Sequence, residues 1–239
     1  MAAAPVGIAF TRSSQFVLVS TEMCRLLRRD ETTLLSHAKD GDAGTIWTLT
    51  DISAEVAERS SLEWAANHDT LTGLANRKAF NQRLLHLFDA LPGSRPSALL
   101  LLDLDRFKSV NDNHGHAAGD AMLRAVATAV QSCVRGSDLA VRLGGDEFAV
   151  LLERCPADVA LRVAEGIRAG VEALRVPWQG QILSAGASVG MAVLAEEINT
   201  AEEWVAQADR ACYDAKAAGR NRVHSTGHLH LQLQWVAGS

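Results

Sequence analysis

The sequence has little of what marks membrane, secreted or nucleic-acid-binding proteins. Its 239 residues carry a formal net charge of -5, which gives no support for a nucleic-acid surface. No apolar run approaches the roughly 20 residues that cross a membrane. Residues 1–5 lack the charged start and apolar core of a signal peptide. We therefore expect a cytoplasmic protein with no membrane span and no nucleic-acid partner.

Cysteines are few and scattered. The four thiols show neither metal-binding nor redox spacing, so they predict buried thiols in a reducing compartment: Cys24, Cys133, Cys155 and Cys212. The composition, with 48% apolar and 21% charged residues, is that of an ordinary globular chain. The length suffices for one sizeable core and a smaller element.

The most informative stretch is residues 141–150, which read as a strand, a two-glycine turn and a second strand. Gly144 and Gly145 permit positive φ and a close approach of a ligand to the backbone. Asp146 and Glu147 stand at the edge of this turn, where two carboxylates suit a divalent metal and a phosphate chain. A plain hairpin with a polar tip is the alternative.

Apolar periodicity predicts the elements around this hairpin. Residues 98–102 form a continuous apolar run, typical of a central strand buried on both faces, and Asp103 follows at its carboxyl end, a typical place for a ligand site. We expect helices near residues 80–91, 122–133, 160–174 and 204–215, and further strands at residues 182–194 and at residue 223. This order predicts an α/β sandwich with a mixed central sheet.

The ends of the chain give weaker signals. Residues 15–19 and 44–50 look like strands, residues 22–29 like a short basic helix, and residues from about 53 to 67 like a longer helix. About 50 residues make a marginal core alone, so this part is expected to pack on a partner or a second copy. Residues 228–236 alternate strictly and suit either an edge strand or an irregular terminus.

Four separated motifs then identify a family. They are Asp69-Thr-Leu-Thr-Gly-Leu-Ala-Asn-Arg77, the segment 103–120, Gly144-Gly-Asp-Glu-Phe148, and Ala208-Asp209 with 213–222. Over about residues 68–224 the chain resembles diguanylate cyclases, the GGDEF-domain enzymes that join two GTP molecules into cyclic di-GMP. The resemblance implies a fold similar to the class III nucleotidyl cyclase catalytic domain and the polymerase palm.

The resemblance also implies a division of the chain. Residues 1–52 would be a truncated PAS-like or regulatory segment and 53–67 a signalling linker helix. Residues 68–226 would form the GGDEF catalytic domain, and residues 227–239 a tail. Because one active half-site holds one GTP and the product joins two, the enzyme is expected to work as a homodimer.

The reaction that the resemblance implies is attack of a 3′-hydroxyl on an α-phosphate, with pyrophosphate leaving. It assigns catalysis to Asp103, Asp146 and Glu147. It assigns two Mg²⁺ ions per active site, with Mn²⁺ as a substitute, to these carboxylates and the Leu104 carbonyl. Asp146 would help to deprotonate the hydroxyl, as a base or as a metal ligand. Crowded like charges predict a raised pKa for at least one of these carboxylates without metal.

The resemblance assigns guanine recognition to Asn111 and Asp120, because a carboxylate and an amide complement the donors and the acceptor of the Watson–Crick edge. Their alternatives are a turn residue and a helix cap. The expected contacts to the rest of the substrate are His116, Arg106, Phe107, Lys108, Gly144, Gly145, Lys216 and Arg220. For Lys216 and Arg220 the alternative is a solvated helix face.

Arg135 and Asp138 resemble the family's site for inhibition by the product, cyclic di-GMP. An arginine can bind the O6 and N7 atoms of guanine in a fork. The alternative is a surface helix end with an Arg–Asp pair. In the family a second arginine from a neighbouring helix or subunit often completes the site; no residue is assigned to that role here, and Gly166 lies near where it would be sought. Two rival functions stay open: an inactive GGDEF domain that binds GTP or cyclic di-GMP, and a different nucleotidyl transferase.

Overall fold

A computed structural model describes residues 6–12, 15–19, 45–50, 61, 64–89, 96–194 and 198–226. The chain divides into two compact units, residues 1–64 and residues 65–239. The second of these is the C-terminal unit.

The first unit contains a three-stranded antiparallel sheet. Its strands are β1 (Val6–Arg12), β2 (Gln15–Val19) and β3 (Thr45–Thr50), in the order β2-β1-β3. The predicted strands at residues 15–19 and 44–50 are confirmed, and β1 is an additional strand between them in the sheet. The predicted helix at 22–29 lies outside the described residues. Of the predicted linker helix, residues 61 and 64–67 are described, and they are helical.

The C-terminal unit is built on a five-stranded sheet with the order β10-β9-β4-β6-β5. The strands are β4 (Ala98–Asp105), β5 (Leu139–Gly144), β6 (Glu147–Leu152), β9 (Gly186–Val193) and β10 (Val223–Thr226). Only the pair β9 and β10 is parallel among them. The expected mixed central sheet is thus confirmed, and it is mostly antiparallel.

The central strand β4 is buried on both faces, as its leucine run predicts. Leu100, Leu102 and Leu104 belong to one apolar cluster, whereas Leu99 and Leu101 belong to a second cluster on the other face. Because side chains alternate along a strand, an unbroken apolar run supplies both faces at once. This strand therefore ends at Asp103 and Asp105 with its carboxyl end fixed between two cores.

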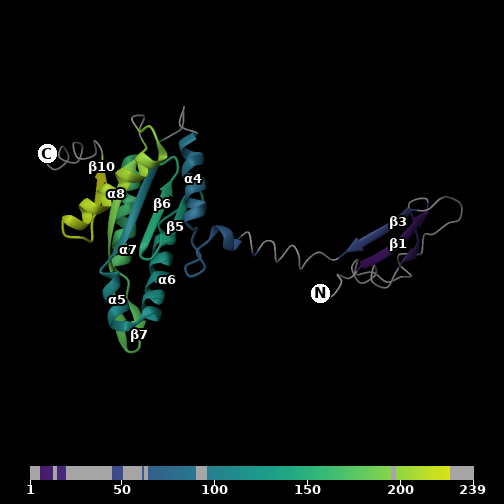
Figure 1. The fold of residues 1–239 in the computed structure, drawn as a ribbon, viewed down its shortest axis with the longest axis horizontal. Helices are drawn as coiled ribbons and strands as arrows, with labels where there is room; N and C mark the ends of the chain where they lie inside the picture. The colour runs from purple at the N-terminus through teal and green to yellow at the C-terminus, as the bar shows by residue number, and fades with distance from the viewer. Residues whose placement is uncertain are drawn as a thin grey trace. The chain divides into compact units, whose positions relative to one another are not determined.

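Helices cover both faces of the sheet (Figure 1). The first cluster includes α5 (Phe107–His114), α6 (His116–Ser132) and α7 (Ala157–Glu172). The second includes α4 (Arg77–Asp89) and α8 (Ala201–Ala217), whose Trp204 is fully buried and donates from Nε1 to the Ala192 carbonyl over 3.0 Å. The result is a helix–sheet–helix sandwich. None of the described helices combines the length and apolar character needed to cross a membrane.

Two local features depart from the expectations. The strand predicted for residues 182–194 is divided into β8 (Gln181–Leu183) and β9, and β8 pairs instead with β7 (Val176–Trp178) in a separate hairpin. Gln179 and Gly180 form the turn with φ 46 and 80, the conformation of a primed hairpin turn. Of the cysteines, Cys155 and Cys212 are buried and Cys133 is partly exposed, while Cys24 lies outside the described residues.

Candidate active site

Two carboxylates face each other across neighbouring strands. Asp103 near the end of β4 lies directly opposite Glu147, the first residue of β6. Directly opposed residues of an antiparallel pair project from the same face of the sheet, so these two carboxylates lie on one face, where β4 ends and β6 begins. The Leu104 N–H donates to the Asp146 carbonyl over 3.3 Å, which fixes the hairpin tip over the end of β4.

The turn between β5 and β6 depends on its two glycines. Gly144 has φ 143 and Gly145 has φ 54, a region that residues with a Cβ rarely adopt. A Cβ at either position would find no atom within 4 Å. The glycines are therefore required by the backbone, and the space above them is open to a ligand.

Arg142 anchors this turn from inside β5. Its Nε and Nη2 donate to the Gly145 carbonyl over 3.1 and 2.9 Å, and its Nη1 donates to both carboxylate oxygens of Asp69. Sequence reasoning assigned no role to either side chain. The available signal was a charged residue between the apolar Val141 and Leu143 of a predicted strand.

Asp103 is held by Lys216 of α8, whose Nζ lies 2.6 Å from Asp103 Oδ2. Burial raises the pKa of Asp103, and the nearby charges of Asp146 and Asp105 add to this, against the opposing effect of Lys216. A raised pKa at this site was expected, but burial contributes more than like-charge crowding. Burial alone would lower the pKa of Lys216, yet its hydrogen bond with Asp103 raises it.

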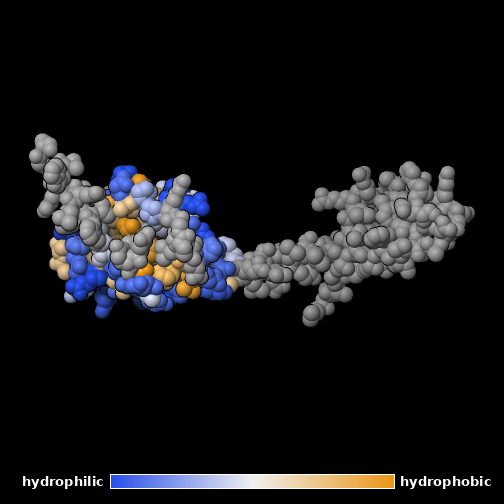
Figure 2. Space-filling model, turned by 90° about the horizontal axis from the view of Figure 1, so that it is seen from above, coloured by the Kyte–Doolittle hydropathy of each residue, from blue (hydrophilic) through white to orange (hydrophobic). Residues whose placement is uncertain are grey.

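A cavity of about 650 Å³ opens between α4 and α8 beside these groups. Asp103, Glu147 and Lys216 line one part of it, and apolar side chains such as Leu84 and Leu85 line another. In the view of Figure 2, apolar residues (orange) reach the surface of the C-terminal unit. The charged part of the cavity, and not its apolar wall, coincides with the predicted catalytic residues.

Asn111, which is predicted to bind guanine, packs beside the residue that precedes Asp120. A Cβ at Gly119 would collide with Asn111 Oδ1, so the Asn111 side chain of α5 lies against α6 immediately before Asp120. His116 begins α6 one turn earlier. The spacing of these residues along the sequence alone did not predict this contact, which depends on the sharp break between α5 and α6 at Gly115, with φ 82.

The predicted phosphate-binding residues lie on two segments. Arg106 has φ 59 and precedes α5 without a side-chain cap, and Phe107 is buried at the start of that helix. Arg220 follows α8 with φ 63. Arg106 and Arg220 both line a second cavity of about 640 Å³ beyond Asp105. Lys108 belongs to the first turn of α5.

The predicted inhibitory pair forms a closed loop between α6 and β5. Asp138, whose side chain is 2% exposed, accepts from the Arg135 backbone and guanidinium and from the Glu153 N–H. The Arg135 side chain is 62% exposed. Gly166 lies near this loop, because a Cβ there would be 3.9 Å from Cys133 Sγ. The Arg135 side chain is thus open to solvent, whereas the Asp138 carboxylate already accepts hydrogen bonds from within the chain.

The donor set fits a hard divalent cation. Asp103 and Glu147 could supply oxygen ligands from paired positions, and Mg²⁺ in proteins is commonly held by one or two carboxylates together with substrate phosphates and water. Among the residues that the structure describes, no three His, Cys, Asp or Glu side chains form a ready-made metal centre. The remaining ligands of a cation here would come from a backbone carbonyl, water or a phosphate.

Comparison with known proteins gives consistent matches. The family model "Diguanylate cyclase, GGDEF domain" matches residues 66–222. The probable diguanylate cyclase DgcE of Escherichia coli (strain K12) is 40% identical over 192 residues, covering 80% of this chain and 17% of that protein. The cyclic di-GMP phosphodiesterase PdeB of Shewanella oneidensis (strain MR-1) is 36% identical over 204 residues, covering 85% and 23%. The chain therefore spans less than a quarter of the length of these two relatives.

A solved structure matches over most of its own length. It is the coiled coil and GGDEF domain of DgcB from Caulobacter crescentus in complex with c-di-GMP, 34% identical, with a TM-score of 0.67. The match covers 74% of this chain and 96% of that one. Both the hairpin carboxylates and the central strand lie within the matched family region. The chain belongs to the GGDEF-domain family of diguanylate cyclases.

Proposed function

We propose that the C-terminal unit condenses two GTP molecules into cyclic di-GMP and two pyrophosphates. One arrangement supports this most: Asp103 lies opposite Glu147, with Lys216 Nζ 2.6 Å from Asp103, beside an open two-glycine turn. In each half-reaction the 3′ oxygen of one GTP bonds to the α-phosphorus of the other. The bond from that phosphorus to pyrophosphate breaks, and the hydroxyl proton passes to Asp146.

Divalent ions would be held by Asp103, Asp146, Glu147 and the Leu104 carbonyl. When bound, Mg²⁺ or Mn²⁺ would neutralise the charge that develops on the phosphate and leaving group, and the proposal takes two ions per site. Lys216 holds Asp103 in place and adds a positive charge beside it.

Base selection is assigned to Asn111 and Asp120. The carboxylate accepts from N1–H and N2–H₂ of guanine, and the amide donates to O6. Adenine would leave these groups unpaired, and such a mismatch can give about 10⁴–10⁵-fold discrimination. His116 completes this side of the site from the start of α6.

Phosphate binding is assigned to the start of α5 and the end of α8. The first backbone N–H groups of a helix attract anions, which gives Phe107 and Lys108 their role. Arg106, Lys216 and Arg220 add side-chain charge. Gly144 and Gly145 let the nucleotide approach the hairpin backbone.

The complete reaction requires two such units, so we propose a homodimer held by the first unit and the linker helix. Deletion of residues 1–60 followed by light scattering tests this. An unchanged monomer–dimer equilibrium after the deletion would overturn this proposal.

Feedback by the product is proposed at Arg135 and Asp138. Support comes from the exposed Arg135 guanidinium, which is oriented by Asp138. Because Asp138 already accepts from Glu153 and Arg135, a bound guanine would have to displace or share these hydrogen bonds.

The test of activity is incubation of the full chain with GTP and Mg²⁺ after bound nucleotide is removed, followed by ion-exchange chromatography. Asp146→Ala is the control. Cyclic di-GMP from the native chain alone is the expected result. Products that contain adenine, formed from mixtures of GTP and ATP, would favour a different nucleotidyl transferase.

A second candidate is a binding module for GTP or cyclic di-GMP without catalysis. One observation favours it: a relative of 36% identity carries the name of a cyclic di-GMP phosphodiesterase, not a cyclase. Nucleotide binding without product, also when the chain is forced to dimerise by a fused coiled coil, would support this function.

A further inference from the structure

The loop after α8 contains two consecutive residues in an unfavourable conformation. Arg220 has φ 63 and Asn221 has φ 45, although neither is glycine. A non-glycine residue in this region is uncommon, and such strain persists only where the surroundings over-determine it. The contacts that hold this loop therefore indicate what the loop is for.

Three hydrogen bonds fix the backbone around Arg220. Its N–H donates to the Ala215 carbonyl over 3.0 Å, and its carbonyl accepts from Arg222 Nε over 3.1 Å. The next N–H, that of Asn221, donates to Asp105 Oδ2 over 2.9 Å. The Cα of Arg220 is thus held from both sides.

Asp105 is fully engaged at the end of β4. Its other oxygen accepts from the hydroxyl of the buried Ser188 over 2.7 Å. The residue opposite it on β9 is Gly186, where a Cβ would lie 3.0 Å from Asp105 Oδ2 and 3.3 Å from Asn221 Cβ. The loop therefore packs so closely on β9 that position 186 has little room for a side chain.

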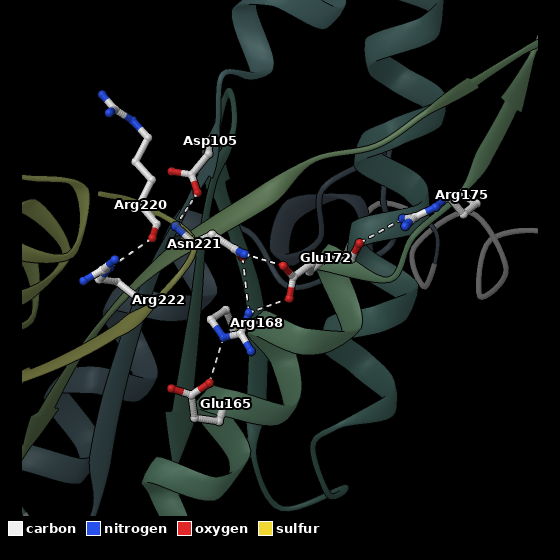
Figure 3. A network of polar contacts seen from close by, with 8 residues as sticks. All are labelled: Asp105, Glu165, Arg168, Glu172, Arg175, Arg220, Asn221 and Arg222. Carbon is white, nitrogen blue, oxygen red and sulfur yellow. Dashed lines mark hydrogen bonds and ion pairs between the residues drawn. The ribbon is translucent and has the colours of Figure 1, made fainter. Parts of the chain in front are cut away.

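The Asn221 side chain extends the network to the end of α7 (Figure 3). Its Nδ2 donates to Glu172 Oε1 over 2.6 Å, and Arg168 Nη1 donates to Glu172 Oε2 over 2.8 Å and to Asn221 Oδ1 over 3.4 Å. The side chain of Arg168 is 20% exposed. The loop is thus tied to both β4 and α7.

We propose that Asp105 is a positioning residue that sets Arg220 for the substrate's terminal phosphates, and that it is not a metal ligand. The Arg220 guanidinium extends away from this network (Figure 3) and forms no ion pair with any residue that the structure describes. The inference rests on the proposed function, in which Arg220 binds phosphate. It adds that Asp103 and Asp105, two residues apart on β4, serve different parts of one substrate.

The test measures the affinity of the full chain for α,β-methylene-GTP and for GMP with Mg²⁺ by calorimetry. The variants are Asp105→Ala, Asp105→Asn, Arg220→Ala and the double Asp105→Ala/Arg220→Ala. Asp158→Ala, which removes an exposed ion pair of α7, is the matched control. An amide at position 105 still accepts from Asn221 and donates to Ser188, whereas it is a poor substitute for a metal-binding carboxylate.

We expect Asp105→Ala and Arg220→Ala each to weaken binding of the GTP analogue about tenfold. This is the effect of losing one charge-assisted hydrogen bond. The double variant should be no weaker than Arg220→Ala, Asp105→Asn should match the native chain, and GMP binding should not change. Fully additive losses, or a loss with Asp105→Asn as large as with Asp105→Ala, would overturn the proposal.

Two further outcomes are separable. If only Arg220→Ala weakens binding, the positioning role fails and the proposed function stands. If Arg220→Ala has no effect, the phosphate role in the proposed function fails, and the positioning role fails with it. If Asp105→Ala does not fold, Asp105→Leu is measured instead, because leucine keeps the approximate volume of the side chain but removes both oxygens that accept from Asn221 and Ser188. Unchanged affinity for the analogue in that variant would contradict the proposal.

Discussion

Arg142 joins Asp69 through one guanidinium nitrogen, which lies 3.1 Å from each carboxylate oxygen. The other nitrogens of the same guanidinium hold the Gly145 carbonyl. The first turn of the C-terminal unit is thereby connected to the hairpin tip. Since the hairpin carries Asp146 and Glu147, this arginine helps to fix the position of both carboxylates.

Arg142→Lys should reduce turnover strongly. One ammonium group cannot reproduce the planar fork that serves Asp69 and Gly145 together. A misplacement of about 1 Å in a catalytic group can cost about 100-fold in rate, which is the loss we expect in kcat. The measurement is cyclic di-GMP formation from GTP, with Arg162→Lys on the exposed face of α7 as control. Native turnover in Arg142→Lys would show that the hairpin does not need this anchor.

Asp69 should make the free energy of unfolding depend on pH in the acid range. Burial raises the pKa of Asp69, but hydrogen bonds from Thr72 and Arg142 outweigh it and lower the pKa below the ordinary 3.8. Folding therefore favours the charged form, so the contribution is present above pH 3.8 and is lost as pH falls through the folded pKa. The free energies of unfolding of Asp69→Asn and the native chain, measured in urea, should differ at pH 7 and converge as the pH falls below the folded pKa of Asp69. A constant difference would contradict the assignment.

Much of this fold could be predicted because its strongest signals are local. The unbroken leucine run of β4 and the spacing of apolar residues in α6 and α7 reflect burial directly. The β7–β8 hairpin was missed because its turn is Gln179-Gly180 rather than a common turn dipeptide. The break between β8 and β9 falls at Ser184 and Ala185, directly before Gly186, and the prediction ran the strand through it although glycine is depleted in strands.

The candidate site was partly predictable for a different reason. Residues such as Asp103 and Glu147 stand in recognisable motifs, so their positions follow from resemblance. Contacts between distant segments do not follow from resemblance. Arg142 and Asp69 are 73 positions apart in the sequence, and Asp105 and Asn221 are 116 apart. No local pattern encodes such pairings, because they depend on how the strands and loops assemble.

Gly190→Ala should destabilise the C-terminal unit. A Cβ at Gly190 would collide with the backbone of Ala208 and Cys212, so α8 could not keep its place on β9. Overpacking of this kind typically costs about 1–3 kcal/mol in the free energy of unfolding. Gly136→Ala is the matched control, since a Cβ there meets no atom within 4 Å. Chemical denaturation should separate the two variants, and equal midpoints would show that α8 can shift without loss.

We expect Arg135 to contact the ligand and Asp138 to stabilise the fold. Asp138→Ala leaves the Glu153 N–H and the Arg135 backbone N–H without their buried acceptor, which should cost about 1–3 kcal/mol in the free energy of unfolding. Arg135→Ala removes an exposed side chain, so stability should change little while affinity for cyclic di-GMP falls. Thermal unfolding and calorimetry with cyclic di-GMP measure the two effects, with Arg162→Ala on α7 as the control for loss of an exposed arginine. If Arg135→Ala binds the dinucleotide as the native chain does, the exposed guanidinium is only a partner of Asp138 and the inhibitory role falls.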